Sequence, residues 1–242
     1  MKASENGPAD SDAAPDEQQV TAREYDRWMT QDTLGSRWVR FWFSPARTVW
    51  LNTPIRRLAA ALRLVPSDRV LDVGCGPAGL LIYLCRKLRF VQPLEGLDCS
   101  ARMIEWGGHE IRARGLEGRL RLRQGAATEL PYPDGAFDVV ICTFVVKHLS
   151  DPLLRRMLSE GKRVLRPGGR LGLWEAAPSR YAFMRVWNQR LLRMGMTVVN
   201  LRSAAQLRVF LEEAGFTELQ PYGHGLYYYY PPMPRVGFIA RK

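Results

Sequence analysis

Three glycines with a fixed spacing occupy the point where a predicted strand meets a predicted helix. The run VLDVGCGPAG at residues 70–79 places Gly74, Gly76 and Gly79 in a G-x-G-x-x-G pattern. Without side chains, such a turn lets the backbone approach a ligand, and the helix that follows offers the N–H groups of its first turn. Asp98 ends the next predicted strand, 19 residues beyond Gly79, where a carboxylate can accept hydrogen bonds from both hydroxyls of a ribose. The turn and the acid together indicate a ligand that contains adenosine.

Two ligands of that kind are compatible with the pattern, a nicotinamide dinucleotide and S-adenosylmethionine. Asp72 lies just inside the strand that leads into the turn. A carboxylate there is unusual beside a pyrophosphate, whereas it suits the ammonium group of a methionine and a nearby sulfonium. The turn also comes after the first 68 residues, and dinucleotide-binding domains usually begin with it. Both features favour S-adenosylmethionine.

Strands and helices alternate along most of the chain. Their spacing predicts strands at 69–74, 93–98, 119–123, 137–145, 169–176, 216–222 and 236–240, and helices at 77–88, 100–114, 152–164 and 203–214. This alternation of strands and helices favours an α/β fold, in which helices cover both faces of a parallel sheet. The segment 178–200 interrupts this rhythm and is predicted to be a helical insertion after the fifth strand.

Four runs resemble the successive motifs of a known family. They are residues 70–79, 96–100, LPYPDGAFDVV at 130–140 and VLRPGG at 164–169. Together they resemble class I S-adenosylmethionine-dependent methyltransferases, in particular the small-molecule group that includes the ubiquinone and menaquinone C-methyltransferases. The resemblance covers roughly residues 25–222. It implies a doubly wound, Rossmann-like sheet of seven strands, parallel apart from an inverted last strand, with the cofactor across the carboxyl ends of the first strands.

The turn and the resemblance together predict one cofactor site. Its residues are Asp72, Gly74, Cys75, Gly76, Gly79, Asp98, Cys99, Met103, Ala126, Ala127 and Thr143. The resemblance implies that residues 74–76 lie against the methionine part, that Asp98 binds the ribose, and that Cys99 and Met103 flank the adenine. Ala126 stands where the family often has Asp or Asn for the adenine amino group, so adenine recognition is expected to depend on the backbone around Ala126 and Ala127. Thr143 is expected near the methionine carboxylate or the transferred methyl.

Methyl transfer is an in-line displacement at a carbon bound to positive sulfur, so a dedicated base is optional. The chain has three histidines, and His109 lies in a polar helix, where a surface position is expected. His148 follows the fourth predicted strand, and His224 lies between two glycines on a predicted turn. Both are candidate catalytic proton acceptors. For each, a packing or loop role is the alternative.

Charge and composition limit the other expectations. The net charge of the 242-residue chain is +11, and residues 1–20 carry one Lys against five acids. We therefore expect a disordered acidic tail at 1–20 and a single domain at 21–242, with an N-terminal lid at 21–66. Arginines spread over several helices argue against nucleic acid. The four cysteines form no CxxC pair, so neither a metal site nor a disulfide framework is expected.

No stretch has the composition of a membrane span or of a signal peptide, which predicts a cytoplasmic protein. Arginines interleaved with aromatic residues at 37–58 and 178–200 also allow peripheral contact with an anionic membrane. The sequence thus predicts a methyltransferase that modifies an oxygen, nitrogen or carbon of a small, aromatic or lipid-like acceptor. A non-catalytic basic binding module and an NAD-dependent oxidoreductase remain as alternatives.

Overall fold

The computed structural model describes residues 17–44, 57–58, 60–193, 196–223, 225–227 and 233–242. Two helices, α1 (Glu17–Thr30) and α2 (Leu34–Phe43), come first. The expected disordered tail therefore ends too late, because Glu17–Val20 already belong to α1. The reason is tertiary: the side chains of Glu17 and Gln18 both accept hydrogen bonds from backbone N–H groups in the body of the domain. Residues 1–16 lie outside the described part.

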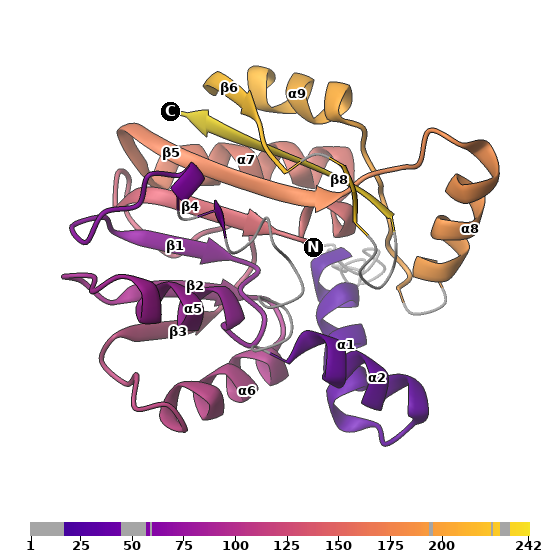
Figure 1. Cartoon of the computed structure of the whole chain (residues 1–242), viewed down its shortest axis with the longest axis horizontal. Helices are drawn as coiled ribbons and strands as arrows, with labels where there is room; N and C mark the ends of the chain where they lie inside the picture. The colour runs from indigo at the N-terminus through magenta and orange to yellow at the C-terminus, as the bar shows by residue number, and fades with distance from the viewer. Residues whose placement is uncertain (1–16, 45–56, 59, 194–195, 224, 228–232) are drawn as a thin grey trace, which may run out of the picture.

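A mixed sheet forms the centre of the molecule (Figure 1). Its strands are β1 (Val70–Val73), β2 (Leu94–Asp98), β3 (Leu120–Gln124), β4 (Phe137–Thr143), β5 (Leu165–Ala176), β6 (Thr217–Pro221), β7 (Gly225–Tyr227) and β8 (Met233–Arg241). The order is β3-β2-β1-β4-β5-β8-β6, and the short β7 pairs with β8. β1 to β5 pair in parallel, whereas β8 is antiparallel to both β5 and β6. This confirms the predicted Rossmann-like sheet with an inverted last strand.

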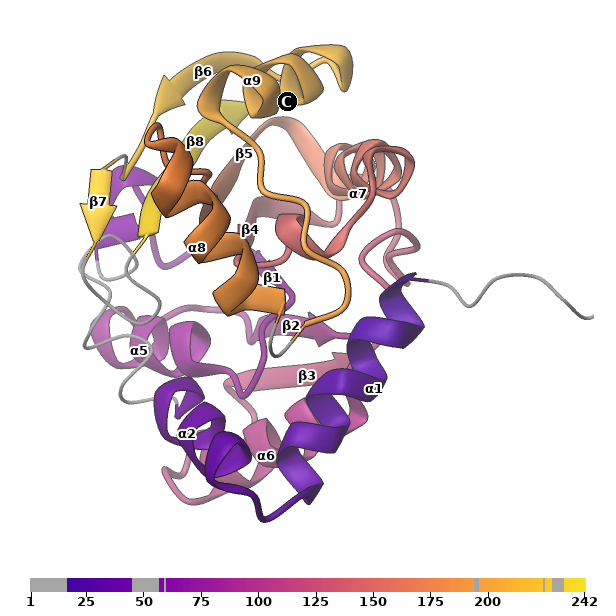
Figure 2. The same cartoon turned by 90° about the vertical axis from the view of Figure 1, so that its right-hand side faces the viewer.

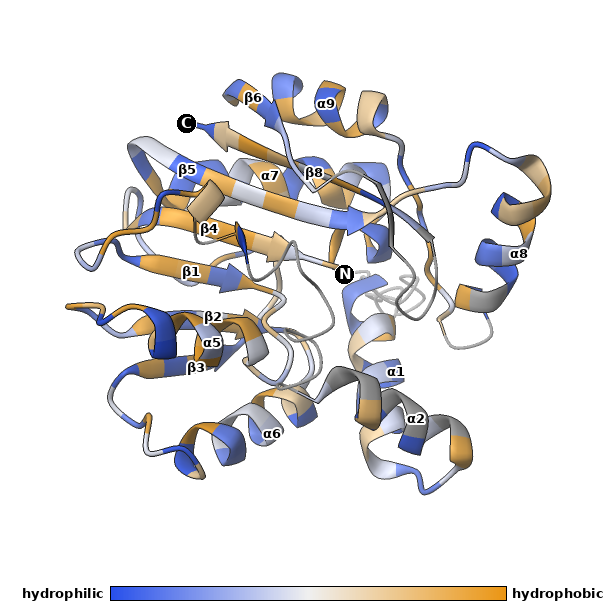
Figure 3. Cartoon of the chain, viewed as in Figure 1, coloured by the Kyte–Doolittle hydropathy of each residue, from blue (hydrophilic) through white to orange (hydrophobic). Residues whose placement is uncertain are grey.

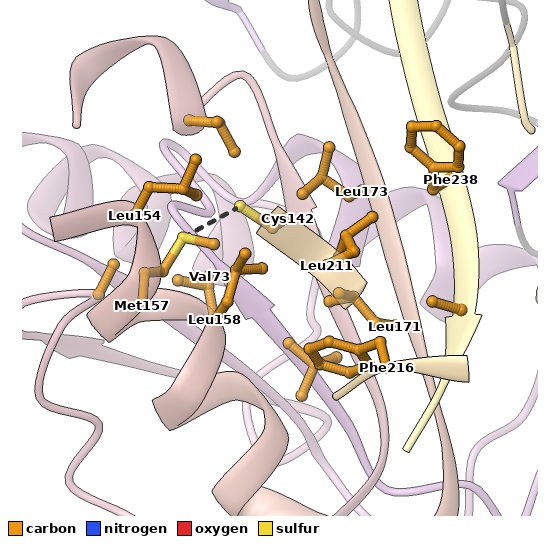
Figure 4. Packing of buried hydrophobic residues seen from close by; sticks show 14 of the residues in the cluster. Val73, Cys142, Leu154, Met157, Leu158, Leu171, Leu173, Leu211, Phe216 and Phe238 are labelled. Atoms are coloured by element: carbon orange, nitrogen blue, oxygen red, sulfur yellow. Dashed lines mark hydrogen bonds between the residues drawn. The ribbon is translucent and has the colours of Figure 1, made fainter. Parts of the chain in front are cut away.

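Two hydrophobic cores cover the two faces of the sheet, because successive side chains of a strand point to opposite faces. Val139 and Ile141 of β4 join the first core, and Val140 and Cys142 of the same strand join the second. The first core contains α5 (Gly79–Lys87) and the end of α6 (Ala101–Arg112). The second contains α7 (Asp151–Val164) and α9 (Ala204–Glu213). Figure 4 shows this second core, where the Cys142 thiol lies 3.9 Å from the Met157 sulfur.

Three elements lie beyond the carboxyl ends of the parallel strands. They are α1, α2 and α8 (Ala182–Arg193), which Figure 1 places on the side to which the arrows of β1, β4 and β5 point. Helix α8 is the predicted insertion after the fifth strand. Figure 2 views the molecule from this side, with α8 above α1 and α2. In the described part of the chain, no helix has the length and apolar character needed to cross a bilayer.

Candidate cofactor and acceptor site

A cavity lies at the carboxyl ends of β1, β2 and β4, beneath α1. Ten of the eleven predicted cofactor residues line it, and so does His148. The lining predicted residues are Asp72, Gly74, Cys75, Gly76, Gly79, Asp98, Cys99, Met103, Ala127 and Thr143. Ala126 is the exception: its neighbours Gly125 and Ala127 line the cavity, and Ala126 does not. His224 lies outside the described residues.

The glycine turn keeps its backbone donors within the protein. The N–H groups of Gly74 and Cys75 both donate to the Leu97 carbonyl, at 2.7 and 3.0 Å. Gly76 N donates to Asp98 Oδ2 at 2.8 Å, and Pro77 has no N–H. A diphosphate would have to compete for these donors, so the geometry is unfavourable for the dinucleotide alternative. Above Gly76 the space is open: a Cβ added there would meet nothing within 4 Å.

Asp72 is a buried carboxylate beside the turn. Its side chain lines the cavity and is 1% exposed, and among the described residues its Oδ1 has no hydrogen-bond partner. Burial, with a smaller contribution from the negative charge of Asp98, raises the pKa of Asp72 to about 7. An unpaired buried carboxylate is costly unless a cation approaches it. The site is therefore suited to a positively charged ligand group.

Asp98 has a structural as well as a ligand-facing position. Its Oδ1 accepts from Ser100 N at 2.9 Å, and Oδ2 accepts from Gly76 N. The carboxylate thus holds the turn and the start of α6 together while it lines the cavity. Burial raises its pKa, and the two backbone donors oppose that rise. Each carboxylate oxygen has further acceptor capacity for a ribose hydroxyl.

Gln18, which the sequence motifs did not indicate, contacts the loop that was expected to face the adenine. Gln18 Oε1 accepts from Ala127 N at 2.9 Å, and Gln18 Nε2 donates to Thr128 Oγ1 at 2.6 Å. Gln18 and Thr21 of α1 both line the cavity. The backbone at Ala127 is thus already engaged by a side chain, which differs from the expectation that it is open to adenine. The helical spacing of Gln18, Thr21 and Tyr25 was the available signal.

Helix α1 is fastened to three other parts of the site. Glu17 Oε2 accepts from Ser150 N at 2.7 Å, at the start of α7. Asp26 Oδ1 accepts from Ser100 Oγ at 2.5 Å and from Arg102 N at 3.2 Å, at the start of α6. Acidic groups at helix N-termini are favourable because the partial charge there is positive. Together with the Gln18 contacts, these bonds hold α1 across the cavity.

Tyr25 connects α1 to His148. The Tyr25 hydroxyl lies 3.1 Å from His148 Nε2, and His148 Nδ1 lies 3.3 Å from the Val198 carbonyl. Because a carbonyl only accepts, Nδ1 carries the hydrogen and Nε2 accepts from Tyr25. Burial, with a smaller effect of the Lys147 charge, holds the pKa of His148 well below its ordinary value. The ring is therefore a neutral acceptor. Trp28 contacts the Tyr25 ring edge-on at 5.1 Å but does not line the cavity.

A buried ion pair supports the loop after β4. Lys147 Nζ lies 3.6 Å from Glu175 Oε1, donates to the Phe144 carbonyl and lies 5.4 Å from the centre of the Phe144 ring. Burial lowers the pKa of Lys147. Phe144 lines the cavity with a φ of +62°, a conformation that side chains rarely adopt. Glu175, at the end of β5, thus has a lysine as its partner.

The remaining candidates have surface or packing positions. His109 is exposed, as predicted, and its Nδ1 lies 3.1 Å from an Arg112 nitrogen. Cys75, Cys85 and Cys142 are buried free thiols, and Cys99 is half-buried at the cavity. No group of three His, Cys, Asp or Glu side chains in the described ranges has an arrangement that would hold a metal ion.

Comparison with known proteins shows which proteins this chain resembles. Residues 70–169 match the family model described as a methyltransferase domain. A demethylmenaquinone methyltransferase of Symbiobacterium thermophilum is 30% identical over 160 residues, which are 64% of this chain and 63% of that protein. A 27-O-demethylrifamycin SV methyltransferase of Amycolatopsis mediterranei is 32% identical over 66% of this chain and 57% of its own length. The chain thus spans less than two thirds of these relatives.

Solved structures agree on the fold. A structure from Thermotoga maritima, described as an S-adenosylmethionine-dependent methyltransferase and possible histamine N-methyltransferase, has a TM-score of 0.64 at 20% identity. The match covers 91% of this chain and 99% of that one. Residues 70–169 therefore match a methyltransferase domain, and the chain is similar in sequence and fold to S-adenosylmethionine-dependent methyltransferases.

Proposed function

We propose that this protein transfers a methyl group from S-adenosylmethionine to an oxygen, nitrogen or carbon of a small aromatic or lipid-like acceptor, and that quinone precursors are the first acceptors to test. The names of the relatives support this choice, because one acts on demethylmenaquinone and another on a 27-O-demethylrifamycin. Their different acceptors are the reason to keep the methylated atom open.

The buried carboxylate of Asp72, whose Oδ1 has no hydrogen-bond partner among the described residues, is the observation that carries the proposal. It is buried at the cavity wall, and burial together with Asp98 raises its pKa to about 7. A ligand ammonium or sulfonium beside it would favour the charged carboxylate and remove the cost of its burial. S-Adenosylmethionine carries both cations, whereas the diphosphate of a dinucleotide would add negative charge at the same place.

The other residues around the cavity bind the cofactor, orient the acceptor and exclude water. S-Adenosylmethionine, when bound, would supply a methyl group whose carbon a nucleophile can attack, while the positively charged sulfur leaves as the neutral thioether of S-adenosylhomocysteine. Gly74 and Gly76 allow close approach at the turn, and Asp98 accepts hydrogen bonds from ribose hydroxyls. Tyr25 and the rest of α1 close the cavity from outside, which keeps water from the reacting atoms and holds the acceptor in line. Thr143 is proposed to face the methionine carboxylate.

We assign His148 the role of proton acceptor for acceptors that carry an acidic hydroxyl. Nε2 is the ring atom that accepts, and it faces Tyr25 at the cavity. An acceptor hydroxyl that takes the place of the Tyr25 hydroxyl would donate to the same atom. Because the pKa of His148 is held low, the ring stays neutral and able to accept at neutral pH. His224, in the part that the structure leaves undescribed, remains a second candidate from the sequence.

Calorimetry with two ligands tests the proposal directly. S-Adenosylhomocysteine, which shares the adenosine and the amino-acid part of the cofactor, should bind to the purified protein with measurable heat, and NADH should not. Heat with NADH alone would overturn the proposal in favour of the oxidoreductase. Incubation with methyl-labelled cofactor and a series of demethylated quinones, phenols and amines should then label at least one acceptor. Cofactor binding without any labelled acceptor would support the non-catalytic binding module.

A further inference from the structure

Helix α8 presents an apolar face that no other described element covers. Phe183 is 77% exposed, Trp187 62% and Val186 49%. These positions share one side of the helix, whereas Asn188 and Leu192 on the other side are buried, the latter against Ala176 and Val199. The inner face therefore packs on the domain, and the outer face exposes large aromatic and aliphatic side chains to solvent.

The outer face of α8 is also strongly basic. Arg190 and Arg193 are exposed on the same side as Phe183 and Trp187, Arg185 is exposed nearer the other side, and the helix contains no acidic residue. In the described ranges, none of these three guanidinium groups takes part in an ion pair. The chain has six arginines and no acid between residues 176 and 211. A surface that combines exposed aromatics with uncompensated positive charge is suited to a partner with both an apolar layer and negative charge.

Helix α2 has a second exposed face of the same kind. Leu34 is 77% exposed, Arg37 is exposed and Phe41 is 44% exposed, at positions that fall on one side of the helix. This helix also lacks acidic residues. Figures 1 and 2 both place α2 and α8 on the side of the molecule beyond the carboxyl ends of the strands. In Figure 3 the ribbons of both helices mix hydrophilic and hydrophobic segments.

We propose that α8 and α2 form a docking surface for an anionic lipid bilayer. Phe183, Trp187 and Leu34 enter the interface between headgroups and acyl chains, while the arginines contact lipid phosphates. A second copy of the chain fits the surface poorly, because the arginines of two such faces would oppose each other. A nucleic acid would pair with the arginines but would leave the aliphatic side chains in contact with its phosphates. The proposal goes beyond the proposed function and does not depend on it.

Co-sedimentation with lipid vesicles tests the surface. The intact protein should sediment with vesicles of equal parts phosphatidylcholine and phosphatidylglycerol and should remain in solution with phosphatidylcholine alone. Part of the binding should persist at high salt, because insertion of aromatic side chains is not screened. Failure to bind the anionic vesicles would overturn the proposal, and so would binding that high salt abolishes entirely.

A matched pair of variants locates the surface. Trp187→Ser/Arg190→Gln/Arg193→Gln removes one exposed apolar side chain and two arginines from α8. Arg86→Gln/Arg89→Gln/Val91→Ser removes the same number from the opposite edge, where Val91 is 72% exposed between α5 and β2. The α8 variant should lower the vesicle partition coefficient on the order of a hundredfold. This estimate multiplies a loss of about fivefold for each of the two arginines by a somewhat larger loss for the tryptophan. The control variant should stay within about twofold of the unchanged protein.

Three further outcomes would overturn the proposal. The first is an equal loss of vesicle binding in the two variants. The second is a protein that does not bind vesicles but forms a dimer on size exclusion, with the dimer lost in the α8 variant. The third is tight binding of RNA without binding of vesicles. Circular dichroism melts of both variants check that each one folds. Because no step measures methyl transfer, failure of the membrane proposal and failure of the methyltransferase proposal give different results.

Discussion

The hydroxyl of Tyr25 lies 3.1 Å from Nε2 of His148, and this contact joins helix α1 to the segment that follows β4. The two residues are 123 positions apart in sequence. Val198, on the connection from α8 to α9, receives the other ring N–H of the same histidine. Three elements therefore meet at one neutral imidazole that lines the cavity, and burial disfavours its protonation.

The stability of the protein should fall in mild acid because of His148. Its folded-state pKa lies well below the value of about 6.5 in an unfolded chain, so the unfolded state binds more protons in that interval. The stabilisation is complete above about pH 6.5 and is lost as the pH falls toward the folded-state pKa. Thermal unfolding followed between about pH 5 and pH 8 should show a steeper acid slope for the unchanged protein than for His148→Gln.

Tyr25→Phe is the matched variant for that measurement. It keeps the ring and removes only the hydroxyl. Because burial is the first cause of the low pKa of His148, the acid slope of this variant should stay close to that of the unchanged protein, whereas His148→Gln should be shallower. If the slopes of all three proteins coincide, the imidazole is not the group responsible. For catalysis, a His148 base with a lowered pKa should keep kcat/KM on its plateau below about pH 6.5, where an unperturbed histidine would already be losing activity.

Asp72→Asn should separate stability from ligand binding. The folded-state pKa of Asp72 is about 7, far above the ordinary value, so the folded protein binds more protons and loses stability as the pH rises from about 4 toward 7. An amide of the same shape has no such cost. We expect a Tm higher by about 5 °C near pH 8 and almost unchanged near pH 4.

The same variant should bind the cofactor more weakly. S-Adenosylmethionine carries an ammonium and a sulfonium, whereas S-adenosylhomocysteine carries only the ammonium, so the loss measured by calorimetry should be larger for the former. A loss of about tenfold or more is expected for it, since a charge-assisted contact contributes roughly 1.5–3 kcal/mol. A lower Tm near pH 8, or unchanged affinity for both ligands, would show that Asp72 has another role.

Two glycines of one turn should respond differently to alanine. A Cβ on Gly74 would lie 2.1 Å from a Val145 methyl carbon, so Gly74→Ala should destabilise the fold by about 2 kcal/mol or more, from the clash and from a φ of +74°. Gly76→Ala meets open space and has only the cost of a φ of +51°, about 1 kcal/mol. It should nevertheless weaken cofactor binding strongly, because the methyl group occupies the place of close approach.

Val145→Ala supplies the control, since it removes the obstructing methyl groups. Combined with Gly74→Ala it should recover part of the lost stability, as measured by urea unfolding and a double-mutant cycle. Combined with Gly76→Ala it should recover none. An interaction energy near zero for the first pair would show that the closeness of Val145 to Gly74 is not the source of the cost.

Sequence could predict the turn and Asp98 because both are set by contiguous chain. The strand that ends at Val73 and the helix that begins at Gly79 define the turn by themselves, and parallel neighbours bring the end of β2 to the same edge. Spacing and the family resemblance therefore indicated ten residues that line one cavity. Ala126 does not line it, because spacing locates a loop but not the direction of each residue within it.

The contributions of Gln18 and Lys147 could not be read in the same way. Gln18 reaches Thr128 across 110 positions, and that contact depends on how α1 packs over the finished sheet. The composition of residues 1–20 as a whole indicates disorder. An average over this segment does not reveal that a few of its polar side chains bind backbone groups in the folded protein. Lys147 looks like a surface lysine in sequence, and only the tertiary fold buries it beside Glu175.

The buried pair of Lys147 and Glu175 should be worth far more to stability than an exposed one. Lys147→Met leaves the Glu175 carboxylate buried with two backbone donors and without its ammonium partner, which should cost about 3–5 kcal/mol in urea unfolding. The double variant Lys147→Met/Glu175→Gln removes both charges and should recover a large part of that loss. Arg102→Met, which breaks an exposed pair with Glu105, is the control and should cost no more than about 0.5 kcal/mol. Two outcomes would contradict this prediction: Lys147→Met costs as little as the control, or the double variant is less stable than the single one. Either would show that the two charges do not stabilise the loop after β4 as a pair. Packing of the lysine stem against Phe144 would then account for the burial of Lys147.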